Sequence, residues 1–97
     1  MMQKRTSLMV AYDILCIGEG GATKTHLVYR GNLNFRLIKK WLSRLIKKGL
    51  IEFHPGTPKT WHTTDRGLRF MLAMDKVYGI WDDGLIRLDE MAQEIVR

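Results

Sequence analysis

The chain has 97 residues, of which 45% are hydrophobic and one is cysteine, which argues against disorder and excludes an internal disulfide framework. A chain of this length forms one domain, expected here over residues 1–97, and is too short for an active-site cavity between two lobes. Its 16 basic residues outnumber its 10 acidic residues, and the net charge of +6 favours an anionic partner.

The positive charge is concentrated in one part of the chain. Residues 1–70 contain 13 Lys and Arg against 4 Asp and Glu, whereas residues 71–97 contain 3 against 6. No acidic residue occurs between Gly20 and Ile51, where eight basic residues do: Lys24, Arg30, Arg36, Lys39, Lys40, Arg44, Lys47 and Lys48. A segment with charge of one sign attracts phosphate polymers or anionic membranes.

The first predicted helix begins at a cap formed by Thr6 or Ser7 and continues to about Ile17. Its residues are apolar almost all round, with a narrow polar strip that includes Cys16. Such a helix is buried on two sides. We therefore expect a second subunit on one side of it, and we expect Cys16 to be a small buried hydrophobic residue.

A helix-turn-helix is predicted next. Residues 18–21 end the first helix, and Thr23 caps a short helix that runs to Arg30. Residues 31–33 then form the turn into a long basic helix. Two helices joined by a tight turn that contains glycine are typical of a helix-turn-helix.

The long basic helix is predicted over residues 34–48, with Asn34 as its N-cap and Gly49 as its left-handed closing residue. On a helical wheel its apolar residues form one broad stripe: Leu37, Ile38, Trp41, Leu42 and Leu45. The opposite side carries Arg36, Lys40, Ser43 and Lys47, flanked by Lys39 and Arg44. The helix thus has one face for a core and one for a polyanion. The aromatic residues Phe35, Trp41, Phe53, Trp61 and Phe70 are expected in the core.

Residues 50–63 predict a β-hairpin, because residues 51–54 alternate and residues 60–63 can return as a second strand. Pro55-Gly56 fits the centre of a type II turn. Thr64 caps a further helix, which Gly79 weakens and residues 82–84 end. Residues 76–97 form an acidic, amphipathic helical extension that must pack on this domain or on a partner.

Four segments carry glycines and caps at consistent offsets: residues 21–25, Asn32-Leu33-Asn34-Phe35, residues 42–51, and Thr64-Asp65-Arg66-Gly67. In these four segments the chain resembles the archaeal winged-helix family of predicted transcriptional regulators, and the resemblance covers about residues 5–75. The resemblance implies a mainly α fold, a winged helix-turn-helix with a three-helix core and one hairpin. It also implies dimerisation through C-terminal helices, since the family includes small, dimeric chromatin-type proteins that bind DNA.

The predicted partner is double-stranded DNA, with the helix of residues 34–48 in the major groove. Asn34 and Arg36, near the start of this helix, are candidates for contacts with base edges. Contacts with phosphates are expected from Thr23, Lys24, Thr25, Lys39, Lys40, Ser43, Lys47 and Lys59. The hairpin would be the wing, with Lys59 touching only the DNA backbone.

A homodimer through the first helix and the C-terminal helices would place two basic helices about one DNA turn apart. Such a protein would be a transcriptional regulator. Two alternatives stay open: a non-specific architectural chromatin protein, and a winged helix that serves as a protein–protein interaction module. An interaction module rarely needs a face with eight cations and no acid.

No enzyme, metal, cofactor or nucleotide is expected. The histidines and Cys16 lack metal-ligand spacing, and no nucleophile–base pair is evident. The run Gly18-Glu19-Gly20-Gly21-Ala22-Thr23-Lys24-Thr25 lacks the glycine before lysine and the preceding strand of a nucleotide-binding loop. With no membrane-length apolar run and no signal-peptide cleavage site, the protein is expected in the cytoplasm, associated with the nucleoid.

Overall fold

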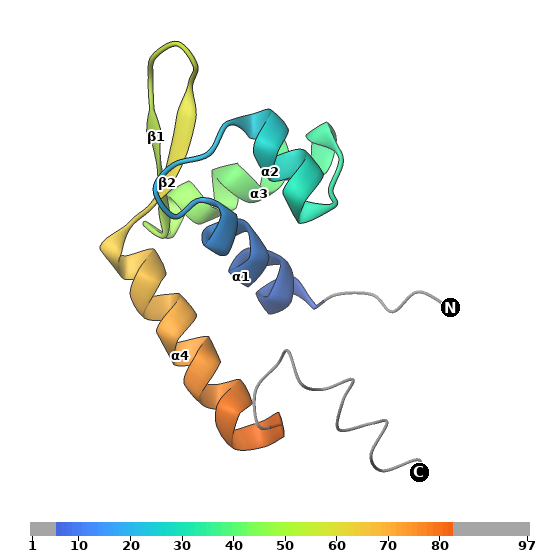
Figure 1. Cartoon of the computed structure of the whole chain (residues 1–97), viewed down its shortest axis with the longest axis vertical. Helices are drawn as coiled ribbons and strands as arrows, with labels where there is room; N and C mark the ends of the chain where they lie inside the picture. Colours follow the sequence, from blue (N-terminus) through green and yellow to red (C-terminus); the bar gives the residue numbers. More distant parts are fainter. Residues whose placement is uncertain (1–5, 83–97) are drawn as a thin grey trace.

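The computed structural model describes residues 6–82 and has the element order of a winged helix (Figure 1). The elements are α1 (Ser7–Ile17), α2 (Lys24–Gly31), α3 (Phe35–Lys47), β1 (Ile51–His54), β2 (Thr60–Thr63) and α4 (Asp65–Asp82). The two strands pair antiparallel, with Ile51 opposite Thr63 and His54 opposite Thr60. The predicted fold class, mainly α with one hairpin, is confirmed. The part of the C-terminal extension that follows Asp82 lies outside the described residues.

Side-chain oxygens cap all four described helices, as predicted. Each oxygen accepts a backbone N–H three residues ahead, which satisfies a donor that has no partner within the helix. The distances are 3.2 Å for Thr6 to Met9, 3.2 Å for Thr23 to His26, 2.8 Å for Asn34 to Leu37 and 3.0 Å for Thr64 to Gly67. The predicted closing glycine of α3 is also confirmed, because Gly49 has a φ of 73°.

The hydrophobic core lies where α1, α2 and α3 meet the base of the hairpin. Its fully buried side chains come from α1, α2, α3 and β1: Ile14, Leu15, Leu27, Ile38, Leu45 and Ile51. Trp61 of β2 is also buried, as predicted. Helix α4 leaves this core and packs along α1 (Figure 1). There the hydroxyl of Tyr12 donates to Asp75 Oδ1 at 2.6 Å, and this hydrogen bond raises the pKa of Tyr12.

Several residues expected in the core are exposed. Cys16 is exposed, whereas its neighbours Ile14 and Leu15 on α1 are fully buried. Leu37 is 41% exposed at the edge of the α3 stripe. Phe35 and Phe53 are exposed as well; Phe53 lies on the hairpin, which projects beyond the helices (Figure 1). Hydrophobic spacing predicted which residues share an apolar face, and tertiary packing decided which of them are buried.

Helix α4 runs through Gly79 to Asp82, the last residue that the structure describes, because a single glycine costs a helix only about 1 kcal/mol. One local expectation is wrong. In the hairpin loop Gly56 has a φ of 157°, far from the value near +80° that a type II turn requires. The loop instead contains a cis peptide bond between Thr57 and Pro58.

Candidate nucleic-acid interface

The start of α2 is joined to the second strand of the hairpin. Ala22 and Trp61 form an isolated antiparallel bridge, with N–H···O distances of 2.9 Å from Ala22 to Trp61 and 2.8 Å in the other direction. Two residues further along, the Lys24 ammonium lies 5.6 Å from the centre of the Trp61 ring. This distance suits a cation–π contact, so the bridge fixes the first cation of α2 beside the wing.

A hollow of about 370 Å³ lies between α2, α3 and β2. We call it the wing-side hollow; its lining residues are Lys24, Lys39, Leu42, Ser43, Ile46, Lys47 and Trp61. It brings together four of the residues predicted to contact phosphate, although Lys24 and Lys47 are separated by most of the helix-turn-helix. No carboxylate is among its lining residues.

The wing-side hollow combines three ammonium groups, one hydroxyl and an apolar bed. Lysine ammonium and serine hydroxyl groups are donors that contact phosphate oxygens in protein–DNA complexes. Leu42, Ile46 and Trp61 form the apolar bed, along which lysine stems can lie while their charged ends stay in water. This arrangement is suited to binding a phosphodiester group.

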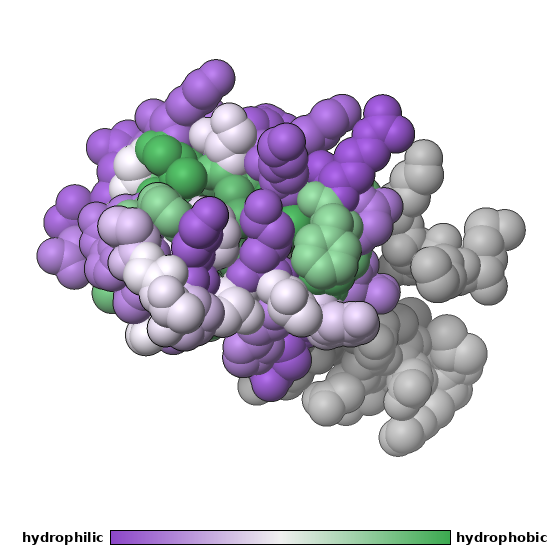
Figure 2. All heavy atoms as spheres, turned by 90° about the horizontal axis from the view of Figure 1, so that it is seen from above, coloured by the Kyte–Doolittle hydropathy of each residue, from purple (hydrophilic) through white to green (hydrophobic). Residues whose placement is uncertain are grey.

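The other predicted contact residues lie around this hollow. Arg36 and Lys40 are exposed on α3, Thr25 is exposed in the first turn of α2, and Lys59 is exposed just before β2. Seen from the end of the molecule that carries the hairpin tip, hydrophilic side chains cover most of the surface (Figure 2). Arg36, Lys40 and Lys59 add positive charge to this surface, and none of the four residues lines the wing-side hollow.

Two of the predicted contact residues already have a structural role. Asn34 Oδ1 accepts from the Leu37 N–H at 2.8 Å, and Thr23 Oγ1 accepts from the His26 N–H at 3.2 Å. Each side chain keeps donors: the Asn34 amide has two N–H groups and the Thr23 hydroxyl has one O–H. Asn34 can therefore donate to a base or a phosphate while it caps α3, but its carbonyl oxygen is partly used.

Two features of this surface were not predicted. On the wing, the rings of His54 and His62 stack with their centres 3.8 Å apart, and His54 Nε2 lies 2.9 Å from Glu52 Oε1. Strand alternation places these three side chains on one face, so the hairpin register could have revealed the cluster. The other feature is the proximity of Arg66 and Arg69 of α4 to the C-terminal end of α3. No sequence signal predicts it, because these segments are far apart in the chain.

Among residues 6–82 no cluster of His, Cys, Asp and Glu could hold a metal ion. None of the described helices is both long and apolar enough to cross a membrane.

This architecture defines a winged helix-turn-helix protein. A family model described as winged helix-turn-helix matches residues 4–80, and the chain belongs to that family. Its fold is similar to that of Sso10a-2, a DNA-binding protein from Sulfolobus solfataricus, with a TM-score of 0.73 and 21% identity over 96% of this chain and 98% of that one. It is also similar to the oxidized form of MarR from E. coli, with a TM-score of 0.69 and 15% identity over 92% and 75%. No curated protein sequence matches significantly.

Proposed function

We propose that the protein binds double-stranded DNA, with α3 in the major groove and the hairpin as a wing against the backbone. The wing-side hollow carries this proposal, because three ammonium groups from two helices converge there without a carboxylate. A major groove is wide enough for one α-helix. The DNA-binding character of the structurally similar Sso10a-2 supports the same assignment.

Within this proposal the residues have different roles. Lys24, Lys39, Ser43 and Lys47 bind one stretch of DNA backbone at the wing-side hollow, and Lys59 extends the contact along the wing. The exposed Arg36 reaches base edges from the first turn of α3. Asn34 combines the cap of α3 with a donated hydrogen bond. Phosphate contacts set affinity and register, while base contacts set specificity.

We further propose that two copies associate through α1 and α4. The exposed side chains Leu8, Leu72, Val77 and Ile80 lie on these helices, and Ile80 is 88% exposed. An apolar surface of this kind on neighbouring helices marks an interaction site. The dimer would present two copies of α3 to one duplex, as helix-turn-helix dimers do when they bind two half-sites.

The salt dependence of DNA binding tests this proposal. The affinity of the full chain for a duplex should fall linearly with salt on a log–log plot, because each neutralised phosphate releases counterions and adds about 0.9 to the slope. Lys39→Ala with Lys47→Ala should therefore reduce the slope by about 2. Lys76→Ala, which removes an exposed cation of α4 outside the wing-side hollow, should leave the slope unchanged.

A flat salt response would contradict DNA binding and favour the protein–protein interaction module. The choice between regulator and architectural protein needs a second comparison, of one genomic site against a scrambled duplex. Arg36→Ala should remove the preference of a regulator for its site while retaining most of the salt slope, because base contacts carry sequence information. An architectural protein should show no preference to lose.

A further inference from the structure

The first turn of α3 carries an exposed aromatic side chain. Phe35 is the first residue of this helix, and it is 51% exposed. Its sequence neighbours Asn34 and Arg36 are the two residues that we expect at base edges. Apolar surface in water is unfavourable, and contact with an apolar partner removes it from water. An aromatic ring therefore lies where the proposed DNA surface begins.

The local structure of α3 does not depend on Phe35. The side chain of Asn34 caps the helix through the Leu37 N–H at 2.8 Å. The apolar contact that closes over such a cap joins the residue before the cap to the fourth helical residue, here Leu33 and Ile38. Ile38 is fully buried, and Leu33 is partly buried against the core. Phenylalanine also has a lower helix propensity than leucine, lysine or arginine, so the start of α3 gives no reason for this ring.

Helical spacing places Phe35 on the side of α3 that forms the wing-side hollow. Lys39 follows Phe35 by four residues and Leu42 follows it by seven, so the three share one face. Both Lys39 and Leu42 line the wing-side hollow. Phe35 therefore extends this face by one turn, from the hollow toward the start of the helix.

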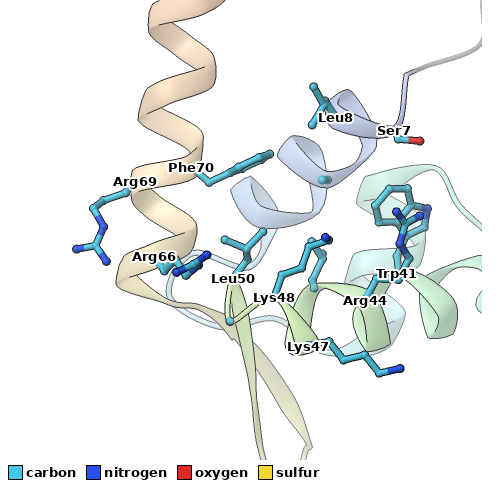
Figure 3. A pocket seen from close by; sticks show the side chains of 13 residues that line it. Ser7, Leu8, Trp41, Arg44, Lys47, Lys48, Leu50, Arg66, Arg69 and Phe70 are labelled. Atoms are coloured by element: carbon cyan, nitrogen blue, oxygen red, sulfur yellow. The ribbon is translucent and has the colours of Figure 1, made fainter.

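The side of α3 toward α1 carries different residues. Trp41 and Arg44 line a second hollow there, together with residues of α1 and α4. Lys47, which also lines the wing-side hollow, points away from α1 (Figure 3). Leu37 precedes Trp41 by four residues and belongs to the side toward α1. Because Leu37 is 41% exposed, the first turn of α3 has an exposed apolar residue on each side.

The charged surroundings of Phe35 restrict what can bind to it. Arg36 and Lys39 are exposed beside it, and no acidic residue occurs between Gly20 and Ile51. Charged residues are depleted at the core of protein–protein interfaces, so this is a poor surface for another protein. A suitable partner is apolar where it meets the ring and anionic around it. The major groove of DNA has both properties, because the C5-methyl group of thymine projects into it and phosphates border it.

We propose that Phe35 contacts the C5-methyl group of thymine in the major groove and gives the protein a preference for thymine at that position. The N-terminal residues of a recognition helix reach base edges, and phenylalanine is among the side chains that contact the thymine methyl group. Asn34 and Arg36 recognise hydrogen-bonding groups of bases, so Phe35 adds a contact that neither of them makes. This inference rests on the proposed function.

The test compares two duplexes of equal length, one of alternating adenine and thymine and the other with deoxyuridine at every thymidine. The second duplex lacks only the methyl groups, and the protein is unchanged. Fluorescence anisotropy at one salt concentration measures binding of the full chain. We expect the thymine duplex to bind about fourfold more tightly, which is the effect of burying one methyl-sized group. In a duplex of alternating guanine and cytosine, 5-methylcytosine in place of cytosine should strengthen binding by a similar factor.

Variants assign this preference to one side chain. Phe35→Ser should bind the thymine and deoxyuridine duplexes equally, and it should retain α3 because serine and phenylalanine have similar helix propensities. Phe35→Leu keeps an apolar side chain and should retain most of the preference. Leu37→Ser is the matched control, since it removes an exposed apolar residue from the other side of the same turn. It should leave the affinity ratio of the two duplexes unchanged.

Three results would contradict the inference. Equal affinity of the unchanged chain for the thymine and deoxyuridine duplexes would overturn it and leave DNA binding intact. A preference that persists in Phe35→Ser would also overturn it, because another residue or the shape of the duplex would then be responsible. Failure to bind any of these duplexes, together with a flat salt response, would overturn the proposed function and this inference with it.

Discussion

Replacing Gly67 with alanine gives a prediction in which helix propensity and tertiary packing have opposite signs. Gly67 lies in the first turn of α4 and is buried. Alanine is favoured over glycine inside a helix by about 1 kcal/mol, so propensity alone predicts a more stable protein. The structure predicts a less stable one, because a Cβ at this position would overlap the Leu50 carbonyl oxygen and lie 2.7 Å from Thr63 Cγ2.

The loss can be estimated from what must move. Overpacking a well-packed site costs about 1–3 kcal/mol, and here the obstacle is backbone that cannot change rotamer. Leu50 is buried, and its carbonyl accepts the Thr64 N–H, so a shift of this strand end also disturbs the junction between α3 and α4. Because the obstacle is backbone, we take the upper end of that cost, about 3 kcal/mol, and after the propensity gain of about 1 kcal/mol we expect a net loss of about 2 kcal/mol. That corresponds to a fall in Tm of about 10 °C for a domain of this size.

The assay is thermal unfolding of the full chain by circular dichroism, at one protein concentration because association also changes Tm. Gly79→Ala is the matched control. Gly79 lies in the same helix, and a Cβ there would meet nothing within 4 Å. It should therefore raise the stability by about 0.5–1 kcal/mol. If Gly67→Ala unfolds at or above the Tm of the unchanged chain while Gly79→Ala behaves as expected, the packing of α4 on Leu50 described above is wrong.

Three further changes test the core, the α1–α4 contact and the cap of α3. Leu27→Ala should lower the free energy of unfolding in urea by about 2–5 kcal/mol, because Leu27 is fully buried; a smaller loss would mean that the site collapses around the cavity. Since the pKa of Tyr12 is raised in the folded state, its contribution to stability is present below the unfolded pKa of about 10 and is lost as the pH rises above it. Tyr12→Phe should lower the free energy of unfolding at pH 7 by about 1 kcal/mol, and the variant should lose less stability above pH 10 than the unchanged chain does. Urea unfolding at pH 7 and above pH 10 measures both, and an equal loss of stability at high pH in the two proteins would contradict this role of Tyr12. Asn34→Ser should keep the cap of α3, whereas Asn34→Ala should lower the free energy of unfolding by about 1 kcal/mol. A DNA-binding defect in both variants would show that Asn34 contacts DNA in addition to capping the helix.

Local features of the chain were predictable because each depends on neighbours in sequence. Thr6, Thr23, Asn34 and Thr64 each satisfy an N–H three residues ahead, and a single side chain is sufficient for that. The two strands of the hairpin followed from the alternation of residues 51–54 and from residues 60–63 returning after the turn. Gly49 was expected in the left-handed region because the helix ended there.

Exposure was less predictable than element type. Cys16, Phe35 and Phe53 are apolar and were expected to be buried, yet each is exposed among the described residues. Hydrophobic spacing shows that a face is apolar, but it does not identify what covers that face. On α1 and α4 the uncovered apolar side chains instead support the proposal of a second copy.

The sequence by itself determined the order of elements, the helix caps and the concentration of cations between Gly20 and Ile51, since these depend on local hydrogen bonds and on composition. Only the tertiary structure decided which cations share a surface. The bridge between Ala22 and Trp61 brings Lys24 to the α3 lysines, and Thr64 brings Arg66 to Lys48. Both junctions join residues far apart in the chain. The net charge can be counted from the sequence, but the interaction between charges depends on their distance in space, which only the folded structure gives.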